Sequence, residues 1–428
     1  MEEMELPEGW KVVPFKDLAK DFGSGGTPST KEPGFWDGPI PWTTSAPIGE
    51  DDIVLERGQR FITEKGLQNS ATRLIPKGSL LVGTRVGVGK AVLNLIDIAI
   101  SQDLTGVRLH PDMVAADFVA YQFKTETVQN FFEKRKRGTT IKGVSRFDLQ
   151  SLVFRVPPLP EQRAIARALR AVQEARATRQ REAALERERK AALMEHLFRY
   201  GTRGEATKET EIGEVPESWR VVRLGDLIGN GHGAIQTGPF GSQLHASDYR
   251  ETGIPVVNPT HLSYNMIVED HLPFIDKETA DKLSKHYLSE GDILISRRGD
   301  FSRYSYITQR YSGWLCGTGC LLIRLNHPEM DNYFLAVSIG TASIQNYLKH
   351  NSVGSIMPNL NTKILQGMPV LLPTLPEQVE VATVLRAFDA KIDALEQEIT
   401  LLDELFHAML EELMTGRLSA VSLIDPTG

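Results

Sequence analysis

Residues 375–413 read LPEQVEVATVLRAFDAKIDALEQEITLLDELFHAMLEEL and carry the clearest periodic pattern in the chain. Apolar residues recur there in steps of four and three, which is the seam of a coiled coil. The seam consists of Val381, Leu385, Phe388, Ile392, Leu395, Ile399, Leu402, Phe406, Met409 and Leu413. A helix with such a seam requires a partner helix.

The opening of this helix occurs twice in the chain. Leu159-Pro160-Glu161-Gln162 repeats Leu375-Pro376-Glu377-Gln378 at an offset of 216 residues. Residues 5–18 (ELPEGWKVVPFKDL) likewise match residues 214–227 (EVPESWRVVRLGDL) at 8 of 14 positions, at an offset of 209. Because the ends of the two copies agree and their middles diverge, we interpret the chain as a duplicated module.

The helix of the first copy is the natural partner of the second. Its seam positions are apolar at both ends and polar in the centre, and it is rich in arginine where the second helix is rich in acids. We therefore predict antiparallel packing, with Arg176, Arg179 and Lys190 reaching past the seam. The residues expected to pair the helices are Ile165, Leu169, Leu193 and Leu197 in the first, and Leu385, Phe388, Ile392, Leu395, Ile399 and Leu402 in the second. Alternatively, the apolar face of the first helix drifts to Ala168, Ala175 and Leu185.

Each copy predicts a strand-rich globule followed by one long helix, and thus an α+β protein with pseudo-twofold symmetry. The globules would be separated by two antiparallel coiled-coil helices. At 1.5 Å per residue, about 40 helical residues span on the order of 60 Å, so the pair would hold the globules at a fixed separation. The expected segments are globule 1 (1–156), helix 1 (157–204), globule 2 (205–372), helix 2 (373–417) and a tail (418–428).

Composition is that of a soluble globular protein, with 428 residues, 41% hydrophobic and 24% charged. The N-terminus begins with acids, and no stretch approaches 18 consecutive apolar residues, so we expect a cytoplasmic protein without a membrane span. Cys316 and Cys320 cannot build a disulfide framework and are poor evidence for zinc. They are interpreted as reduced thiols in a strand region.

Enzyme signatures come close and fail. Residues 83–90 (GTRVGVGK) resemble a phosphate-binding loop, but five residues separate the outer glycines and Ala91 stands where a hydroxyl is needed. Asn258-Pro259-Thr260-His261 lacks the second proline and the aromatic of an amino-methyltransferase loop. We therefore expect no catalytic residue and no metal site on this chain.

Binding chemistry remains, although a net charge of −7 argues against coating nucleic acid by bulk charge. Lys134–Arg137 precede a glycine and two threonines, and the second copy is again polar around the same glycine. Cations and small hydroxyls suit phosphates, and arginine forks suit guanine edges. The candidate DNA-binding residues are Arg85, Lys134, Arg135, Lys136, Arg137, Thr139, Thr140, Lys142, Arg146, Arg297, Arg298, Arg303, Asn351 and Ser355. A solvated loop and surface salt bridges are the alternatives.

Aromatic residues are more easily explained as core than as base-stacking surface. The predicted core aromatics are Phe35, Trp36, Trp42, Phe61 and the repeated pair Trp10 and Trp219.

Three patterns together resemble the specificity subunit of type I restriction-modification systems. They are the Pro-x-x-Trp opening of each copy, Gly-Asp-Ile-Leu-Ile at 291–295, and Leu-Pro-Glu-Gln at the start of each long helix. The resemblance spans essentially the whole chain. One departure is Phe15-Lys16 in the first copy, where the second has the more familiar Leu224-Gly225.

The resemblance implies a subunit that is not itself an enzyme. Each globule would read one half of a bipartite double-stranded DNA target, and the helices would set the spacing and bind two modification (methyltransferase) subunits. Restriction subunits would join the complex, and S-adenosylmethionine, ATP and Mg²⁺ would bind to the partner subunits. One alternative is a specificity component whose partner fuses methylase and nuclease; another is a DNA-independent coiled-coil scaffold.

Overall fold

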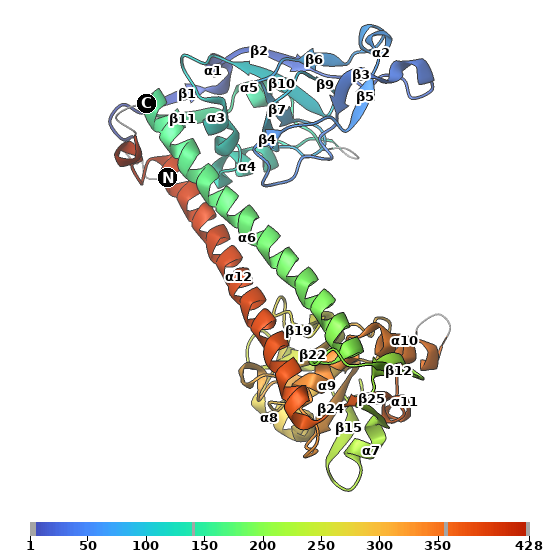
Figure 1. Cartoon of the computed structure of the whole chain (residues 1–428). Helices are drawn as coiled ribbons and strands as arrows, with labels where there is room; N and C mark the ends of the chain where they lie inside the picture. Colours follow the sequence, from blue (N-terminus) through green and yellow to red (C-terminus); the bar gives the residue numbers. More distant parts are fainter. Residues whose placement is uncertain (1–5, 139–141, 355–357, 425–428) are drawn as a thin grey trace. The chain divides into compact units, whose positions relative to one another are not determined.

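The computed structural model describes residues 6–138, 142–354 and 358–424, and it divides into two compact units (Figure 1). The first unit comprises the chain up to residue 181 together with the chain from residue 396. The second unit comprises residues 182–395. Helices α6 (Leu159–Tyr200) and α12 (Leu375–Thr415) each contribute one part to each unit. The fold is mixed α and β with strand-rich sheets and two long helices, as the sequence predicts.

Among its described residues, the first unit contains three sheets and five short α-helices. Strands β1 (Lys11–Pro14) and β11 (Val153–Val156) pair antiparallel. The five-stranded sheet has the order β2 (Ala19–Ser24), β10 (Leu104–Leu109), β7 (Leu80–Gly83), β8 (Ala91–Asn94) and β4 (Val54–Leu55). The four-stranded sheet has the order β5 (Arg60–Ile62), β3 (Trp36–Thr43), β9 (Ile98–Ile100) and β6 (Arg73–Ile75). The short helices are α1 (Phe15–Leu18), α2 (Glu64–Gln68), α3 (Ala116–Gln122), α4 (Glu126–Glu133) and α5 (Arg146–Gln150).

The second unit repeats this plan. Strands β14 (Arg220–Arg223) and β25 (Pro369–Leu372) pair antiparallel. Two four-stranded sheets follow: β15 (Gly233–Thr237), β24 (Cys320–Leu325), β21 (Ile293–Ser296), β22 (Tyr304–Tyr306); and β16 (Tyr249–Arg250), β20 (Phe274–Ile275), β17 (Ile254–Val257), β23 (Leu315–Cys316). Two hairpins are β12 (Thr207–Thr210) with β13 (Gly213–Pro216), and β18 (Leu262–Ser263) with β19 (Met266–Ile267). The shorter helices are α7 (Leu224–Ile228), α8 (Lys277–Lys282), α9 (Asn332–Ile339), α10 (Ala342–Asn351) and α11 (Thr362–Gln366).

The repeated glutamines tie each globule to its long helix. Gln162 is fully buried; its Oε1 accepts from the Ala115 N–H at 2.8 Å, and its Nε2 donates to the carbonyls of Pro157 (2.8 Å) and Met113 (3.2 Å). In the second unit Gln378 accepts from the Asp331 N–H and donates to the carbonyls of Pro373 and Glu329, at 2.8–2.9 Å. The Leu-Pro-Glu-Gln repeat is therefore a structural anchor.

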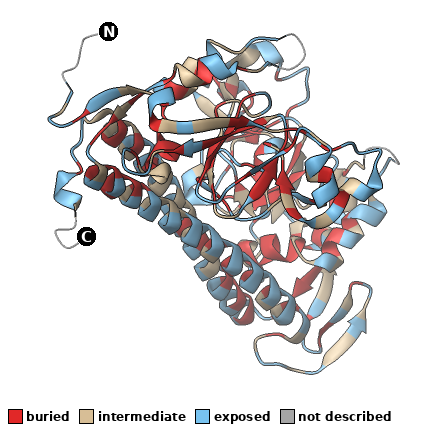
Figure 2. Ribbon diagram, turned by 90° about the horizontal axis from the view of Figure 1, so that it is seen from above, coloured by how far each residue is buried: buried red, intermediate tan, exposed pale blue. Residues whose placement is uncertain are grey.

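The two long helices pack antiparallel in both units, as their opposite charges predict. The cross-helix ion pairs are Arg176–Asp403 (3.3 Å) and Arg179–Glu398 (2.6 Å) in the first unit, and Lys391–Glu186 (2.8 Å) and Lys190–Asp389 in the second. Buried residues, red in Figure 2, lie along one side of each helix, while the opposite side is exposed. The three cations predicted to reach past the seam thus end on acids of the partner helix.

The seam of α6 keeps its register through its polar centre. Ala183, Glu186 and Lys190 are buried, whereas Ala175 and Leu185 are exposed, so the alternative of a drifting apolar face is wrong. Towards the end of α6 the contact shifts by one residue. Leu193 and Leu197 are half-buried there, and Met194 and Phe198 enter the core beside them. The seam residues of α12 are buried or half-buried throughout.

Most of the predicted core aromatics are buried. Trp10, Trp36, Trp42 and Trp219 are at most 7% exposed. The prediction for Phe61 is wrong, because its side chain is 48% exposed. Phe61 lies on β5, an edge strand in which Ile62 pairs with Ile40 and turns inward, so the alternation of a strand turns Phe61 outward.

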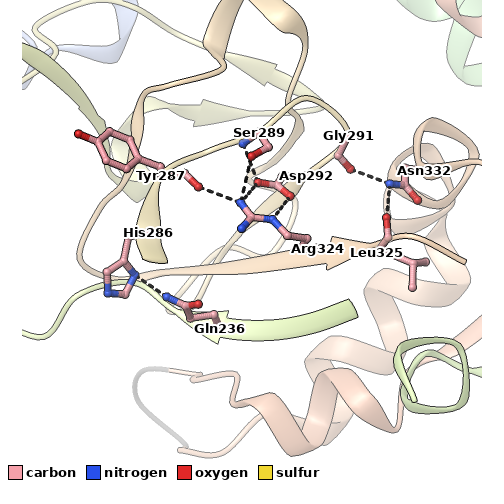
Figure 3. A network of polar contacts seen from close by, with 9 residues as sticks. All are labelled: Gln236, His286, Tyr287, Ser289, Gly291, Asp292, Arg324, Leu325 and Asn332. Atoms are coloured by element: carbon pink, nitrogen blue, oxygen red, sulfur yellow. Dashed lines mark hydrogen bonds and ion pairs between the residues drawn. The ribbon is translucent and has the colours of Figure 1, made fainter. Parts of the chain in front are cut away.

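The Gly-Asp-Ile-Leu-Ile motif supplies the buried acid of an ion pair in the second unit, with a half-exposed arginine (Figure 3). Arg324 on β24 donates two hydrogen bonds to Asp292, from Nε to Oδ1 at 2.8 Å and from Nη2 to Oδ2 at 2.5 Å. Its Nη2 also donates to the Tyr287 carbonyl at 2.8 Å, and the Ser289 N–H donates to Asp292 Oδ2 at 2.8 Å. The Asp292 side chain is only 3% exposed, so this motif residue fixes the turn before β21.

His286 lies beside this network and is 2% exposed (Figure 3). Its Nδ1 is 2.9 Å from Gln236 Nε2, and its Nε2 has no hydrogen-bond partner among the described residues. Burial lowers the pKa of His286 from 6.5 to about 4. The folded unit therefore holds this imidazole neutral at pH 7.

The buried His286 makes the protein less stable as the pH falls. The unfolded chain binds a proton near pH 6.5 and the folded chain only near pH 4, so the free energy of unfolding decreases as the pH falls through that window. His286→Gln does not titrate in this range. We therefore expect its free energy of unfolding to rise by about 3 kcal/mol relative to that of the wild type as the pH falls from 7 to 4. Urea denaturation at several pH values measures this difference. Parallel pH profiles for the two proteins would contradict it.

Candidate nucleic-acid interface

The described residues on either side of positions 139–141 pair with each other and lie against the end of β7. The Arg137 N–H donates to the Gly143 carbonyl at 2.8 Å, and the Gly143 N–H donates back at 2.9 Å. The Val144 N–H then donates to the Thr84 carbonyl at 2.8 Å. These bonds bring the basic loop next to Arg85.

Three arginines surround a hollow of about 580 Å³ in the first unit, here called the arginine hollow. They are Arg85, Arg137 and Arg146, and the polar lining includes Ser24, Gln102 and Thr105. Arg146 Nη2 donates to Ser24 Oγ at 2.7 Å, which fixes that guanidinium. Among the described residues neither Arg85 nor Arg137 forms an ion pair. Guanidinium groups so placed attract phosphates and can bind guanine edges.

The other predicted cations of this loop divide into two groups. Arg135 lies over the Phe131 ring at 3.7 Å and 4.0 Å from the Asp148 carboxylate, and Lys136 pairs with Glu133. Lys134 and Lys142 are exposed. Thr139, Thr140 and Ser355 lie outside the described residues. Lys134 and Lys142 are therefore the exposed cations of this stretch, whereas Arg135 packs against the protein.

The second unit has the same loop arrangement. Val353 and Asn359 exchange two backbone hydrogen bonds of 3.0 Å, as Arg137 and Gly143 do, and the Leu360 N–H donates to the Arg297 carbonyl at 2.8 Å. Gly138 and Gly354 occupy equivalent places with φ of 126° and 107°, where a residue with a Cβ is strained. The candidate interface is therefore duplicated together with the fold.

Arg298 is the counterpart of Arg85. Each follows the strand beside its loop, and each is exposed. The other candidates of the second unit are partly used inside the protein. Arg297 Nε donates to the Leu360 carbonyl at 3.3 Å, Arg303 lies 3.8 Å from Asp300, and Asn351 Nδ2 donates to the Tyr347 carbonyl at 2.9 Å.

Sequence reasoning missed Phe147 and Val86 at this surface. Phe147 is 77% exposed and Val86 45% exposed, and each follows an arginine of the hollow. An apolar residue is ordinarily assigned to the core, so only its position beside Arg146 could have marked Phe147.

The buried Asp148 lies at the arginine hollow and fixes the backbone there. Asp148 Oδ2 accepts from the Ser145 hydroxyl at 2.5 Å and from the Ser145 N–H at 3.1 Å, and the Asp148 N–H donates to Ser145 Oγ at 3.0 Å. The bond from the hydroxyl holds the pKa of the Asp148 carboxyl below its usual value. This reciprocal capping box fixes the start of α5.

Within residues 6–138, 142–354 and 358–424, no group of three or more His, Cys, Asp or Glu side chains is placed to bind a metal ion. No helix in the described part of the chain is long and apolar enough to cross a membrane. Cys316 and Cys320 are both buried and unpaired with each other, and burial raises the pKa of the Cys316 thiol to about 12.

Comparison with known proteins gives one family. The model of the type I restriction modification DNA specificity domain matches residues 7–187 and again residues 216–404. The type I restriction enzyme MjaIX specificity subunit of Methanocaldococcus jannaschii is 22% identical over 427 residues, covering 98% of this chain and 96% of that protein. The EcoR124I/EcoR124II specificity subunit of Escherichia coli is 27% identical over 165 residues, 37% of this chain and 39% of that protein.

Solved structures agree in fold. The crystal structure of the type I restriction-modification S subunit from M. genitalium aligns with a TM-score of 0.61 and 17% identity, covering 96% of this chain and 98% of that one. A chain from a structure of type I R-M complex assembly and conformational transition aligns with a TM-score of 0.55 and 19% identity, covering 97% and 100%. The family model matches both halves of the duplicated chain, which therefore belongs to the family of type I restriction-modification DNA specificity subunits.

Proposed function

We propose that each unit reads one half of a bipartite double-stranded DNA target. The observation that carries this proposal is the duplicated loop: Arg85 and Arg298 stand at equivalent exposed places. Each follows a residue whose carbonyl accepts a backbone hydrogen bond from the loop, Thr84 from Val144 and Arg297 from Leu360. Two readers of the same architecture with different side chains suit two different half-sites.

The helix pair would set the distance between the half-sites and bind two modification subunits. Cross-helix ion pairs in both units support a stiff pair, and a stiff spacer corresponds to a fixed number of unread base pairs. In this proposal the chain is non-catalytic. Methyl transfer, ATP use and cleavage, with S-adenosylmethionine, ATP and Mg²⁺, belong to the modification and restriction subunits.

A map of methylated bases across the genome tests this function. We expect deletion of the gene to remove one bipartite motif, two short half-sites around a constant gap. Complementation with Arg85→Ala should relax or weaken one half-site, and Arg298→Ala should affect the other, because each arginine belongs to one unit. Complementation with the wild-type gene is the control.

A scaffold that does not bind DNA predicts a different result. The complex purified with its partner subunits would then show no sequence-dependent, salt-sensitive affinity for a duplex that carries the motif. An unchanged methylation map together with this absence of binding would refute the proposed function.

A further inference from the structure

Helices α5 and α11 are the same element in the two units. They begin 216 residues apart, and each has five residues. Ser145 caps the first by accepting from the Asp148 N–H at 3.0 Å, and Asn361 caps the second by accepting from the Ile364 N–H at 2.9 Å. Leu149 and Leu365 anchor them with 0% exposure. The residues that hold the helix are thus equivalent.

The exposed residues of the two helices differ. Phe147 in α5 stands where α11 has Lys363, and both side chains are exposed. Arg146 stands where α11 has Thr362. The duplication therefore keeps the cap and the anchor and changes the outward side chains, which is expected of positions that meet different half-sites.

The exposure of Phe147 has no structural use. At 77% it is more exposed than any other large apolar residue in the described chain, and the buried residues of α5 are its neighbours Asp148 and Leu149. Exposing a phenyl ring forgoes the hydrophobic stabilisation that its burial would give. Such a residue, presented by a capped helix directly after Arg146, suits a partner that is both apolar and negatively charged.

Duplex DNA combines these two properties at its base edges and phosphates. Arg146, held at 2.7 Å by Ser24, precedes Phe147, and both Arg85 and Arg137 line the same hollow as Arg146. Phenylalanine contacts DNA either at the thymine methyl group in the major groove or as a wedge between base pairs.

We propose that Phe147 makes an apolar contact with a base of the half-site read by the first unit, and so determines specificity there. This inference rests on the proposed function. The capped helix α5 presents the ring, and the arginines of the hollow hold the flanking phosphates or base edges. Lys363 gives the second unit a different contact at the same place.

The test compares binding by the complete complex containing wild-type chain, Phe147→Ala, Phe147→Leu or Lys363→Ala. Duplexes carry the methylation motif or one substituted base pair at each position of the two half-sites, at one salt concentration. We expect Phe147→Ala to lose about tenfold discrimination at one or two adjacent positions of a single half-site, and Phe147→Leu to keep part of it. Lys363→Ala should leave that half-site unchanged. Unaltered thermal unfolding shows that the variants are folded.

The outcomes separate the inference from the function beneath it. If the wild type discriminates in both half-sites and Phe147→Ala discriminates equally well at every position, the inference is overturned and the proposed function stands. If the wild type shows no base preference, both fail. Replacing thymine by uracil in the duplex identifies the kind of contact. If Phe147 contacts the thymine methyl group, the replacement weakens binding by the wild type but not by Phe147→Ala. If Phe147 is a wedge between base pairs, the replacement leaves binding by both proteins unchanged.

Discussion

Arg324→Ala is expected to lower the free energy of unfolding of the second unit by about 2–3 kcal/mol. The substitution removes both contacts to Asp292 and leaves a carboxylate that is 3% exposed without its counter-ion. It also removes the bond from Nη2 to the Tyr287 carbonyl. Chemical denaturation measures the loss of stability, and hydrogen exchange of peptides from β21 and β24 shows that the loss arises around the ion pair.

Two variants show whether the stranded charge is the cause. Arg324→Ala combined with Asp292→Ala should be more stable than Arg324→Ala alone, because no charge remains buried. Arg220→Ala removes an arginine of the same unit whose ion pair with Glu329 (3.1 Å) is 60% exposed on both sides. That control should cost less than about 1 kcal/mol. Equal losses for Arg324→Ala and Arg220→Ala would show that the pair with the buried Asp292 contributes no more than a surface pair.

Gln162→Leu should destabilise the junction between the first globule and α6 by about 3–5 kcal/mol. Three backbone groups lose their partner: the Pro157 carbonyl is buried, and the Ala115 N–H and the Met113 carbonyl are partly buried. A buried group left unsatisfied costs about 1–3 kcal/mol, and a partly buried one less. Gln378→Leu should do the same in the second unit, since its three bonds are equivalent. The readout is the unfolding free energy, with hydrogen exchange in α3 for Gln162→Leu and in α9 for Gln378→Leu.

A surface glutamine serves as the matched control. Gln397 lies on α12 and is exposed, so Gln397→Leu should change stability by less than about 0.5 kcal/mol. If Gln162→Leu were as mild as Gln397→Leu, the repeated glutamine would not be the anchor that its contacts indicate.

The duplication and the pairing of the two long helices could be predicted, because both follow from patterns in the local sequence. A seam in steps of four and three and complementary charges depend only on residues within each helix. The shift from Leu193 and Leu197 to Met194 and Phe198 could not be predicted, because it depends on the core that α6 enters in the second unit. The outward side of Phe61 likewise follows from a strand register that its own sequence does not state.

The roles of motif residues were harder to predict than their positions. Glu161 is recognisable in the sequence only as part of a repeat, yet its carboxylate accepts from the indole of Trp10 at 3.2 Å, 151 residues away. Asp292 depends on an arginine from another strand. For the candidate site, sequence placed Arg85, Arg137 and Arg146 in one function but gave no reason to choose them over Arg135, whose guanidinium is held by Phe131 and Asp148.

The interleaved make-up of the units has a consequence for synthesis on the ribosome. The core of the first unit includes Phe406, Leu410, Leu413 and Ala420, which are translated after the whole of the second unit. At 5–20 residues per second, the matching face of α6 waits for its partner on the order of ten seconds or more. During that delay the apolar face of α6 that packs against α12 is exposed on the nascent chain. We therefore expect chaperones to bind this face before α12 is synthesised.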